Sequence, residues 1–320
     1  SSDTVTLGAA ITDANVTGNI NILTGIFDNG GFSIATVSSD TFQVNNVATF
    51  ILSGTSGWPS GFTDVLGSTI VYGGGNQTIT MPSNGQVYST LVIAGTGTKT
   101  LGENITVSTE LRINPTGTTL DASASDFDIN LAGNWVNNGA FNATGGNVIF
   151  NGSSAQTIGG SAVTTFNNLT INNSSGGASL TSTQNVTGTV TLTSGVFSTS
   201  GGQPFTLISN PSGTARIGEV TGGSMSGSFT MQRYIDGNDG WRFLTPPVSG
   251  TTLADWNGEF AMSGFPGVPT TLPPFTSIWT YNETEPYVRD SGYVAPSDIS
   301  DGLVSGRGYF AWVGDAPGNP

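Results

Sequence analysis

A long internal repeat constrains the fold of this 320-residue chain more than any other feature of its sequence. Residues 67–107 align with residues 146–186 at an offset of 78 or 79, and residues 15–27 align with residues 185–197. Self-similarity on this scale is typical of proteins in which stacked units share one core. The alignment superposes Tyr72 on Phe150, Gln77 on Gln156, Ile79 on Ile158, Leu91 on Leu169, Leu101 on Leu180 and Val107 on Val186.

Within each copy, apolar and polar residues alternate with a period of two. In the segment TVTL (189–192), Val190 and Leu192 alternate with threonines. This pattern is typical of a strand with one buried face. Turn dipeptides such as Asn138-Gly139 and Gly176-Gly177 separate the short runs. No stretch carries an apolar stripe of helical period, so we expect almost no helix.

Many short strands of this kind can form a sandwich, a barrel or a parallel β-helix. The repeat and the narrow apolar alternation favour a right-handed parallel β-helix, a solenoid, over residues 1–225, with about ten coils of roughly 20–25 residues each. A tandem of small sandwiches remains the alternative. Asparagine recurs at strand ends, where stacked side chains can bond from coil to coil; these residues are Asn134, Asn137, Asn138, Asn167, Asn168, Asn172 and Asn173.

The composition changes near residue 225, and the stretch GGSMSGS (222–228) marks the join. Residues 226–320 hold most of the tryptophans and tyrosines, and we predict that they form a β-sandwich-like module that caps the solenoid. Its expected strands are 228–234, 241–244, 277–281 and 309–313. The expected core is aromatic and consists of Trp241, Phe243, Trp279, Tyr281, Phe310 and Trp312.

The composition excludes several kinds of chemistry. The chain has no His and no Cys, which excludes Ser-His-Asp triads, cysteine nucleophiles, the usual zinc sites, and haem or iron–sulfur ligation. Seven basic residues against 21 acidic ones give a net charge of −14, so we expect neither nucleic-acid binding nor docking on an anionic membrane. No apolar run approaches the roughly 20 residues of a membrane span, so we expect no direct membrane insertion.

Asp121, Asp126 and Asp128 form the best enzymatic candidate. If Asp126 and Asp128 stand two residues apart on one strand, both carboxylates project from the same face, and paired carboxylates can hydrolyse glycosides. The simpler interpretation, which we prefer, is a solvated strand face with Phe127 and Ile129 turned inward.

A calcium site is the second candidate, and Ca²⁺ is the one cofactor that the sequence suggests. Asp236, Asn238 and Asp239 in the segment DGNDG place hard oxygen ligands on a tight turn, which suits Ca²⁺ although a strict EF-hand loop is absent. An ordinary polar hairpin turn gives the same pattern. A second acidic loop, with the same plainer interpretation, contains Asn282, Glu283 and Glu285.

Other residues suggest binding. Thr-x-Thr pairs at 78–80, 98–100, 189–191 and 191–193 can meet glycan hydroxyls or ordered water, although strand formers that face solvent give the same pattern. Each of three aromatic residues either stacks on a sugar or belongs to a core or an interface: Trp58, Trp256 and Tyr287. Three scarce arginines are expected to pair with acidic residues: Arg233, Arg242 and Arg307.

Several phrases resemble the repeats of large cell-surface proteins of Bacteroidetes that the type IX secretion system exports. They are GNWVNNGAF (133–141), VIFNGSSAQTIGG (148–160), TFNNLTI (165–171) and VTGTVTLTSGVF (186–197). The later stretches MQRYIDGNDGWRFLTPPVSG (231–250), IWTYNETEP (278–286) and GLVSGRGYFAWV (302–313) are similar to a module that often follows such repeats. The resemblance implies an extracellular adhesin or surface fibre, anchored to the outer membrane through another part of a longer chain. It implies no catalytic residues.

We therefore expect a non-enzymatic structural segment of a surface adhesin, fibre or appendage. Its expected partners are other copies of itself, other surface proteins, or glycans on target cells. The second hypothesis is a glycan-binding module of a secreted polysaccharide-handling protein. The third is a β-helix polysaccharide hydrolase or lyase.

Overall fold

The computed structural model describes residues 3–12, 14–35, 40–55, 57–59, 61–64, 67–82, 85–114, 117–269, 275–285 and 290–314. The chain divides into two compact units, Ser1–Tyr234 and Ile235–Pro320. The first unit is a parallel β-solenoid of about ten turns, which confirms the predicted architecture. The boundary expected at residue 225 precedes β28 (Thr230–Met231), which still pairs with β23 (Phe205–Leu207) of the solenoid.

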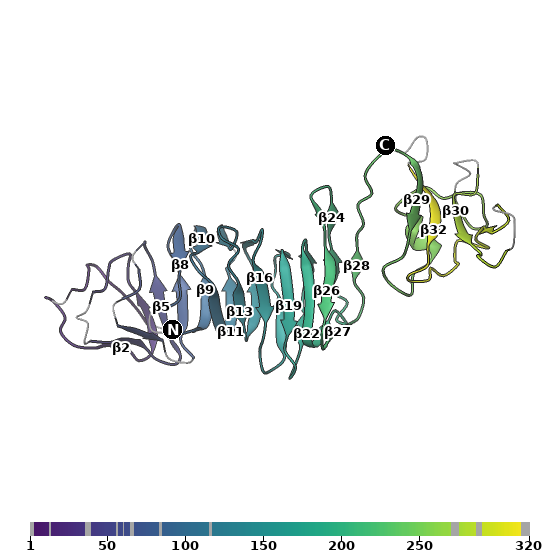
Figure 1. Ribbon diagram of the computed structural model, residues 1–320. Helices are drawn as coiled ribbons and strands as arrows, with labels where there is room; N and C mark the ends of the chain where they lie inside the picture. Colours follow the sequence, from purple (N-terminus) through teal and green to yellow (C-terminus); the bar gives the residue numbers. More distant parts are fainter. Residues whose placement is uncertain are drawn as a thin grey trace. The chain divides into compact units, whose positions relative to one another are not determined.

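From β8 onward the turns of the solenoid contribute strands to three faces, whereas the described strands before β8 lie on two. Strands of successive turns pair in parallel (Figure 1). Face 1 contains β1 (Thr4–Thr6), β3 (Gly25–Asp28), β5 (Ala48–Leu52), β7 (Thr69–Tyr72), β9 (Tyr88–Ile93), β14 (Asn134–Asn137), β17 (Gln156–Gly159), β20 (Ala178–Leu180) and β27 (Gly223–Ser226). Face 2 contains β2 (Ile20–Ile22), β4 (Phe42–Val44), β6 (Phe62–Asp64), β13 (Ile129–Leu131), β16 (Asn147–Phe150), β19 (Asn168–Asn172) and β26 (Arg216–Val220). Face 3 contains β8 (Gln77–Ile79), β10 (Gly97–Leu101), β12 (Thr118–Asp121), β15 (Ala140–Asn142), β18 (Thr164–Phe166), β21 (Gln184–Val186), β23 and β28.

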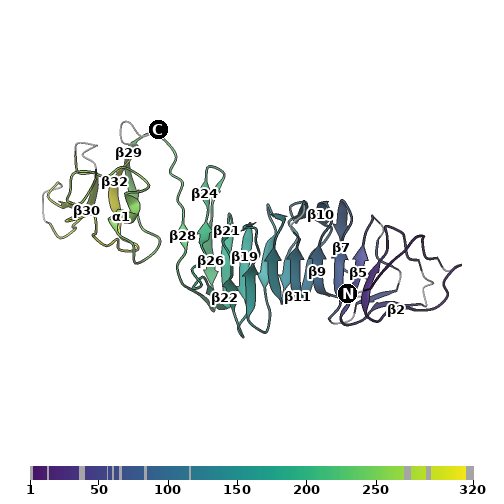
Figure 2. The same cartoon turned by 180° about the vertical axis from the view of Figure 1, so that it is seen from behind.

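Two long strands, β11 (Ile105–Ile113) and β22 (Thr189–Ser198), run from face 2 to face 1 without a break. The first half of β11 pairs with β13 and its second half with β14, so the corner between the faces is a bend in one strand. Figure 2 shows the strands from behind, stacked in chain order. The short hairpin of β24 (Ser209–Asn210) and β25 (Gly213–Thr214) is the one antiparallel pair in the described part of the solenoid.

The period-two alternation places the apolar side chains in one continuous core. On face 1 the register joins Phe50 to Ile70, Ile70 to Leu91, Leu91 to Leu111, and Leu111 to Trp135, and all five side chains are fully buried. Burial of each such side chain contributes roughly 1.5–3 kcal/mol. Each turn therefore closes the core of the turn before it.

The repeat that relates residues 67–107 to residues 146–186 does not coincide with the turn of the solenoid. Leu91 lies on face 1 but its counterpart Leu169 lies on face 2, and Val107 on face 2 corresponds to Val186 on face 3. From β7 to its counterpart β16, the chain passes three further strands of face 1 and then one of face 3. The repeat therefore advances by three turns and two of the three faces.

Buried glutamines fix two corners of the solenoid in the same way. Gln77 donates from Nε2 to the carbonyl oxygens of Leu52 (2.9 Å) and Gly54 (2.6 Å), and its Oε1 accepts the N–H of Gly74 at 3.0 Å. Gln156 repeats the arrangement in its own corner, where its amide bonds to the backbone of Leu131, Gly133 and Gly152. The repeated glutamine is therefore a structural clamp between successive turns.

Asparagines also link successive turns, as the sequence suggests, but the partner in these bonds is the backbone or a hydroxyl group instead of another asparagine. The Oδ1 of Asn134 accepts the N–H of Thr157 at 2.9 Å, and the Oδ1 of Asn168 accepts the N–H of Thr189 at 3.0 Å. Similar bonds join Asn76 to Thr98 N, Asn104 to Asp128 N, Asn138 to Ser161 N and Asn172 to the hydroxyl of Ser194.

The C-terminal unit is built on one antiparallel sheet with the order β29 (Gly240–Leu244), β32 (Tyr309–Val313), β30 (Ile278–Tyr281) and β31 (Tyr293–Val294). In the described residues of this unit the strands form this sheet alone, instead of the two of a sandwich. The short helix α1 (Leu253–Trp256) and the loops cover one face. The core on that face consists of Leu253, Met262, Phe265, Ile278, Leu303, Tyr309 and Ala311.

The prediction of an aromatic core for this unit is wrong. Phe243 is 79% exposed, and none of the six aromatic residues expected inside belongs to the buried cluster. Side chains alternate along each strand, so the covered face of the sheet carries Ile278, Tyr309 and Ala311, and the six aromatic residues expected inside lie on the other face. The covering segments pack on the side of Ile278 and Ala311 and leave the opposite side open. The segment 228–234, expected as a strand of this unit, supplies only β28, which pairs within the solenoid.

Candidate functional site

The open side of the C-terminal sheet, which we call the aromatic face, is the strongest candidate for a functional site. The strand register pairs Trp241 with Trp312, and it pairs Phe243 with Phe310. Because directly opposed residues share a face, these side chains lie together. The full aromatic face consists of Trp241, Phe243, Phe275, Trp279, Tyr281, Tyr293, Phe310 and Trp312.

The rings of the aromatic face contact one another in a single network. Trp241 stacks on Phe310 with ring centroids 4.5 Å apart, and Phe243 tilts against the same ring at 4.9 Å. Tyr281 and Tyr293 meet edge to face at 5.2 Å. Such pairs add about 0.5–1.5 kcal/mol beyond the burial of area, so the network holds the rings in defined orientations.

Much of this surface faces solvent. Phe243 is the most exposed large apolar residue among those described, and Tyr281 is 45% exposed. Ala311, one residue along β32 from Phe310, is fully buried on the other side of the sheet. A contiguous group of exposed rings of this kind marks an interaction site.

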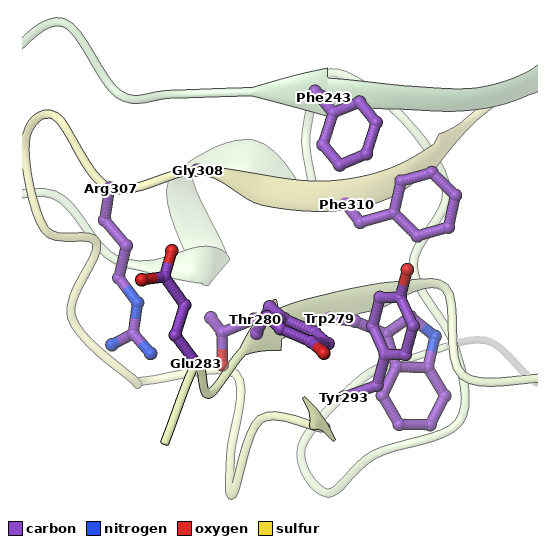
Figure 3. A pocket seen from close by; sticks show the side chains of 9 residues that line it. Phe243, Trp279, Thr280, Glu283, Tyr293, Arg307, Gly308 and Phe310 are labelled. Carbon is purple, nitrogen blue, oxygen red and sulfur yellow. The ribbon is translucent and has the colours of Figure 1, made fainter. Parts of the chain in front are cut away.

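The aromatic face contains a cavity of about 440 Å³, a volume within the range of small-molecule sites. Figure 3 shows the rings at one end of the cavity and the charged side chains of Arg307 and Glu283 at the other. In the described part of the chain, the single ion pair joins Glu110 to Arg112, so neither charged group of the cavity has an ionic partner there. The cavity therefore combines apolar ring surfaces with open hydrogen-bonding groups.

The loop proposed for calcium bonds to the guanidinium of Arg242, which lies on β29. The guanidinium of Arg242 donates to the carbonyl oxygen of Asn238 at 2.8 Å, and Asp236 accepts the N–H of Gly237 at 2.8 Å. Asp236, Asn238 and Asp239 are all exposed. Among the described residues, no three His, Cys, Asp or Glu side chains are placed to hold a metal ion.

The carboxylates proposed for glycoside hydrolysis do not share a strand face. Asp126 lies in a turn with φ of 54°, and β13 begins only at Ile129. Asp121 lies on β12, where its Oδ1 accepts the hydroxyl of Ser123 at 2.6 Å. Asp128 accepts the N–H of Asn147 at 3.0 Å. The prediction that Asp126 and Asp128 project from one strand is therefore wrong, because the chain turns before the strand starts.

The second acidic loop is ordered by its own side chains. Asn282 accepts both the N–H of Thr284 (3.1 Å) and its hydroxyl (2.7 Å) through Oδ1. Of the three residues proposed there, Glu283 reaches the cavity of the aromatic face, whereas Glu285 lies 3.5 Å from the Asn282 amide.

The aromatic residues proposed for sugar stacking have structural positions where they are described. Trp58 packs on Phe62 with ring centroids 4.5 Å apart, and its indole N–H donates to the carbonyl oxygen of Thr80. Trp256 packs against the core of the C-terminal unit, 5.6 Å from the ring of Tyr309. Tyr287 lies outside the described residues.

The three arginines that we expected in ion pairs have no acidic partner in the described part of the chain. Arg242 bonds to two backbone carbonyl oxygens, those of Trp241 and Asn238. Arg307 lines the cavity of the aromatic face, and Arg233 is exposed.

Two of the threonine pairs lie side by side on face 3. Thr78 on β8 is the register partner of Thr100 on β10, and both border a second hollow of about 430 Å³, together with Thr80 and Thr98. The pairs at 189–191 and 191–193 lie on β22, at a distance of several turns along the chain. The structure therefore brings together four of the threonines and leaves the others apart.

Two buried groups in the solenoid had no assignment from sequence. The Lys99 side chain is fully buried, and its Nζ donates to the carbonyl oxygens of Gly74 and Thr96, each at 2.7 Å. Burial lowers the pKa of this ammonium group. The Tyr72 hydroxyl lies 3.0 Å from that of Tyr88, and burial raises the pKa of Tyr72 well above its ordinary value. Both groups are enclosed by the coils and serve the fold.

Sequence reasoning missed the cavity because it assigned the largest rings to the core. The signal was present in YFAWV (309–313), where Phe310 and Trp312 alternate with Ala311. The small residue indicates the side on which α1 and the loops pack closely, and the large rings then belong to the other side.

Comparison of the chain with models of protein families, with curated proteins and with solved structures gives no match. Among the described residues, the structure contains no helix with the length and apolar character needed to cross a membrane.

Proposed function

We propose that this chain is a non-catalytic structural segment of a larger extracellular surface protein, an adhesin or fibre, in which the solenoid acts as a stiff spacer. The observation that carries the proposal is the parallel pairing of strands through about ten successive turns. At roughly 4.8 Å per turn, such a stack spans about 50 Å.

The stiffness has an identifiable physical origin. Bending the stack requires stretching hydrogen bonds on one face, and the clamps of Gln77 and Gln156 tie two corners to the turn before them. The core supports the same rigidity, since the rings of Phe42 and Phe50 pack 4.9 Å apart and those of Phe42 and Phe62 6.0 Å apart. Stability in such an array sums over neighbouring turns, which suits a part that transmits force.

The surface location is a proposal that rests on the resemblance of the repeats to exported Bacteroidetes proteins and on the composition. Only 9% of the residues are charged, and the net charge of −14 disfavours nucleic acid as a partner. Other copies of the chain, or other proteins of the same surface, are the partners that fit a spacer.

Immunolabelling of intact producing cells with an antibody against this chain tests the location, and negative-stain imaging of the sheared parent protein tests the mechanical role. We expect labelling without permeabilisation, and straight segments in the images. Labelling that requires permeabilisation, or segments that bend freely over about 50 Å, would refute the proposal.

A direct assay tests the enzymatic alternative. Incubation of the chain with pectin- and alginate-like polysaccharides should release no reducing ends or unsaturated products. If products appear and are lost in the Asp121→Asn variant, the chain is an enzyme and the spacer role is secondary.

A further inference from the structure

We propose that the cavity of the aromatic face binds a neutral saccharide, with pyranose rings packed against Phe243 and Tyr281 and hydroxyl groups bonded by Arg307 and Glu283. This inference does not depend on the mechanical role of the solenoid. The site lies entirely in the C-terminal unit, on the sheet formed by β29, β32, β30 and β31.

The exposed rings match one side of a sugar. A pyranose presents a face of C–H groups, which carry partial positive charge and pack on the negative face of an aromatic ring. Phe243 is 79% exposed and Tyr281 is 45% exposed, so both rings offer surface to a ligand. Phe310 supports Phe243 from below at 4.9 Å, and Tyr293 supports Tyr281 at 5.2 Å, which keeps the exposed rings in fixed positions.

The charged end of the cavity matches the rim of a sugar. Arg307 supplies several N–H donors and Glu283 supplies two acceptor oxygens, and hydroxyl groups of a saccharide act as both acceptors and donors. Since the described residues give neither side chain an ionic partner, their hydrogen-bonding capacity is open to a ligand. Figure 3 shows both side chains at the same end of the cavity, opposite the rings.

Charge and shape favour a neutral saccharide over other ligands that stack on rings. The chain carries a net charge of −14, which repels nucleic acids and polyanionic polysaccharides. A protein partner with an apolar surface would bury Arg307 and Glu283 without compensating bonds, at a cost in desolvation. The hollow of about 440 Å³ suits a small ring-shaped ligand better than a broad flat interface.

The test is titration of the 320-residue chain with defined neutral hexaoses of glucose, xylose, mannose and N-acetylglucosamine, preceded by a broad neutral-glycan array. Binding is followed by calorimetry and by tryptophan fluorescence, because Trp279 lines the cavity. We expect at least one probe to bind with a dissociation constant below about 1 mM. Tyr281→Ala and Phe243→Ala should each weaken that binding about tenfold, as truncation of an aromatic anchor does.

A matched control separates the cavity from general effects. Tyr234 is also 45% exposed and lies outside the cavity, so Tyr234→Ala should leave binding unchanged. Near-ultraviolet circular dichroism tests whether the variants remain folded. We expect Phe243→Ala to fold normally, because the Phe243 side chain is largely exposed. Glu283→Gln and Arg307→Met test the polar end of the cavity. They should weaken binding, while the fluorescence change of Trp279 should persist at high ligand concentration.

Three results would overturn the inference. The first is an array in which no neutral glycan binds. The second is binding that survives both Phe243→Ala and Tyr281→Ala, which would place the site elsewhere, for example at the threonines of face 3. The third is concentration-dependent self-association in sedimentation velocity that Phe243→Ala abolishes, because the aromatic face would then be a contact between copies of the chain.

Discussion

Replacement of Gln156 by leucine tests whether the repeated glutamine holds the solenoid together. The Gln156 side chain is 1% exposed and makes four hydrogen bonds. Its Nε2 donates to the carbonyl oxygens of Leu131 (2.8 Å) and Gly133 (2.5 Å), and its Oε1 accepts from Gly152 N (2.9 Å) and Asn173 Nδ2 (3.0 Å). Leucine has a similar size and makes none of these bonds.

The loss of stability in Gln156→Leu depends on which of the four bonded groups keep another hydrogen-bond partner. Leu131 O also accepts the N–H of Asn151, and Asn173 Nδ2 also donates to Ser154 O, so both remain satisfied. The N–H of Gly152 and the carbonyl of Gly133 lose the Gln156 bond. An unsatisfied buried group costs about 1–3 kcal/mol, and because both glycines are only partly buried we take the lower half of that range. With two such groups, the expected loss in the free energy of unfolding is about 2–4 kcal/mol.

Urea unfolding, followed by the fluorescence of the solenoid tryptophans, and calorimetry measure this loss. For a unit of this size the loss corresponds to a fall in Tm of about 4–16 °C. Gln77→Leu should behave alike, because Gln77 makes the equivalent bonds in its own corner. Thr157→Val, on the outward side of the same strand, is the control and should change stability by less than about 0.5 kcal/mol. A change for Gln156→Leu as small as that of the control would refute the clamp.

Three further predictions concern a buried cation, a glycine and the proposed calcium loop. Burial lowers the pKa of Lys99, so between that pKa and about 10.4 the folded state binds fewer protons than the unfolded state. As pH rises toward 10, the Tm of the native chain should therefore rise relative to the Tm of Lys99→Met. If the two Tm values change with pH in parallel, the prediction is wrong. Gly160 has φ of 121°, and a Cβ there would lie 2.0 Å from the carbonyl oxygen of Asn137, so Gly160→Ala should destabilise the solenoid by more than about 2 kcal/mol in urea unfolding, whereas Gly201→Ala should have little effect. Calcium at millimolar concentration should leave the Tm of the C-terminal unit unchanged relative to chelator, because Arg242 occupies the Asn238 carbonyl in that loop; a rise of several degrees would show that Asp236 and Asp239 bind the ion.

The solenoid could be predicted because local alternation and global stacking agree in it. Val190 and Leu192 face inward on β22 as their pattern indicates, since a narrow core admits only one side of each strand. The alternation fails at Asp126, where a polar residue adopts a positive φ and the chain turns before β13. The pattern of apolar and polar residues cannot predict such a turn, because the residues of the turn continue the alternation of a strand.

The candidate site could not be predicted, because its identity depends on which side of a sheet is covered. Both sides of β32 are apolar, with Tyr309 and Ala311 on one and Phe310 and Trp312 on the other. Size alone assigns the larger rings to the interior. Which side of the sheet is covered depends on α1 and the loops around Met262 and Leu303, which are distant in sequence and carry no periodic pattern.

The mismatch between repeat and turn has a consequence for how the solenoid can have grown. A duplicated segment that advances by three turns and two faces places each of its strands on a different face from the strand it copies, as Leu91 on face 1 and Leu169 on face 2 show. Such an insertion keeps an intact core only if a strand from one face of the solenoid can pack equally well on another face. The same rotation places the outward residues of these two copies on different faces. Neighbours that recognise both copies would therefore approach the solenoid from two sides, and lateral bundling would have no single preferred face.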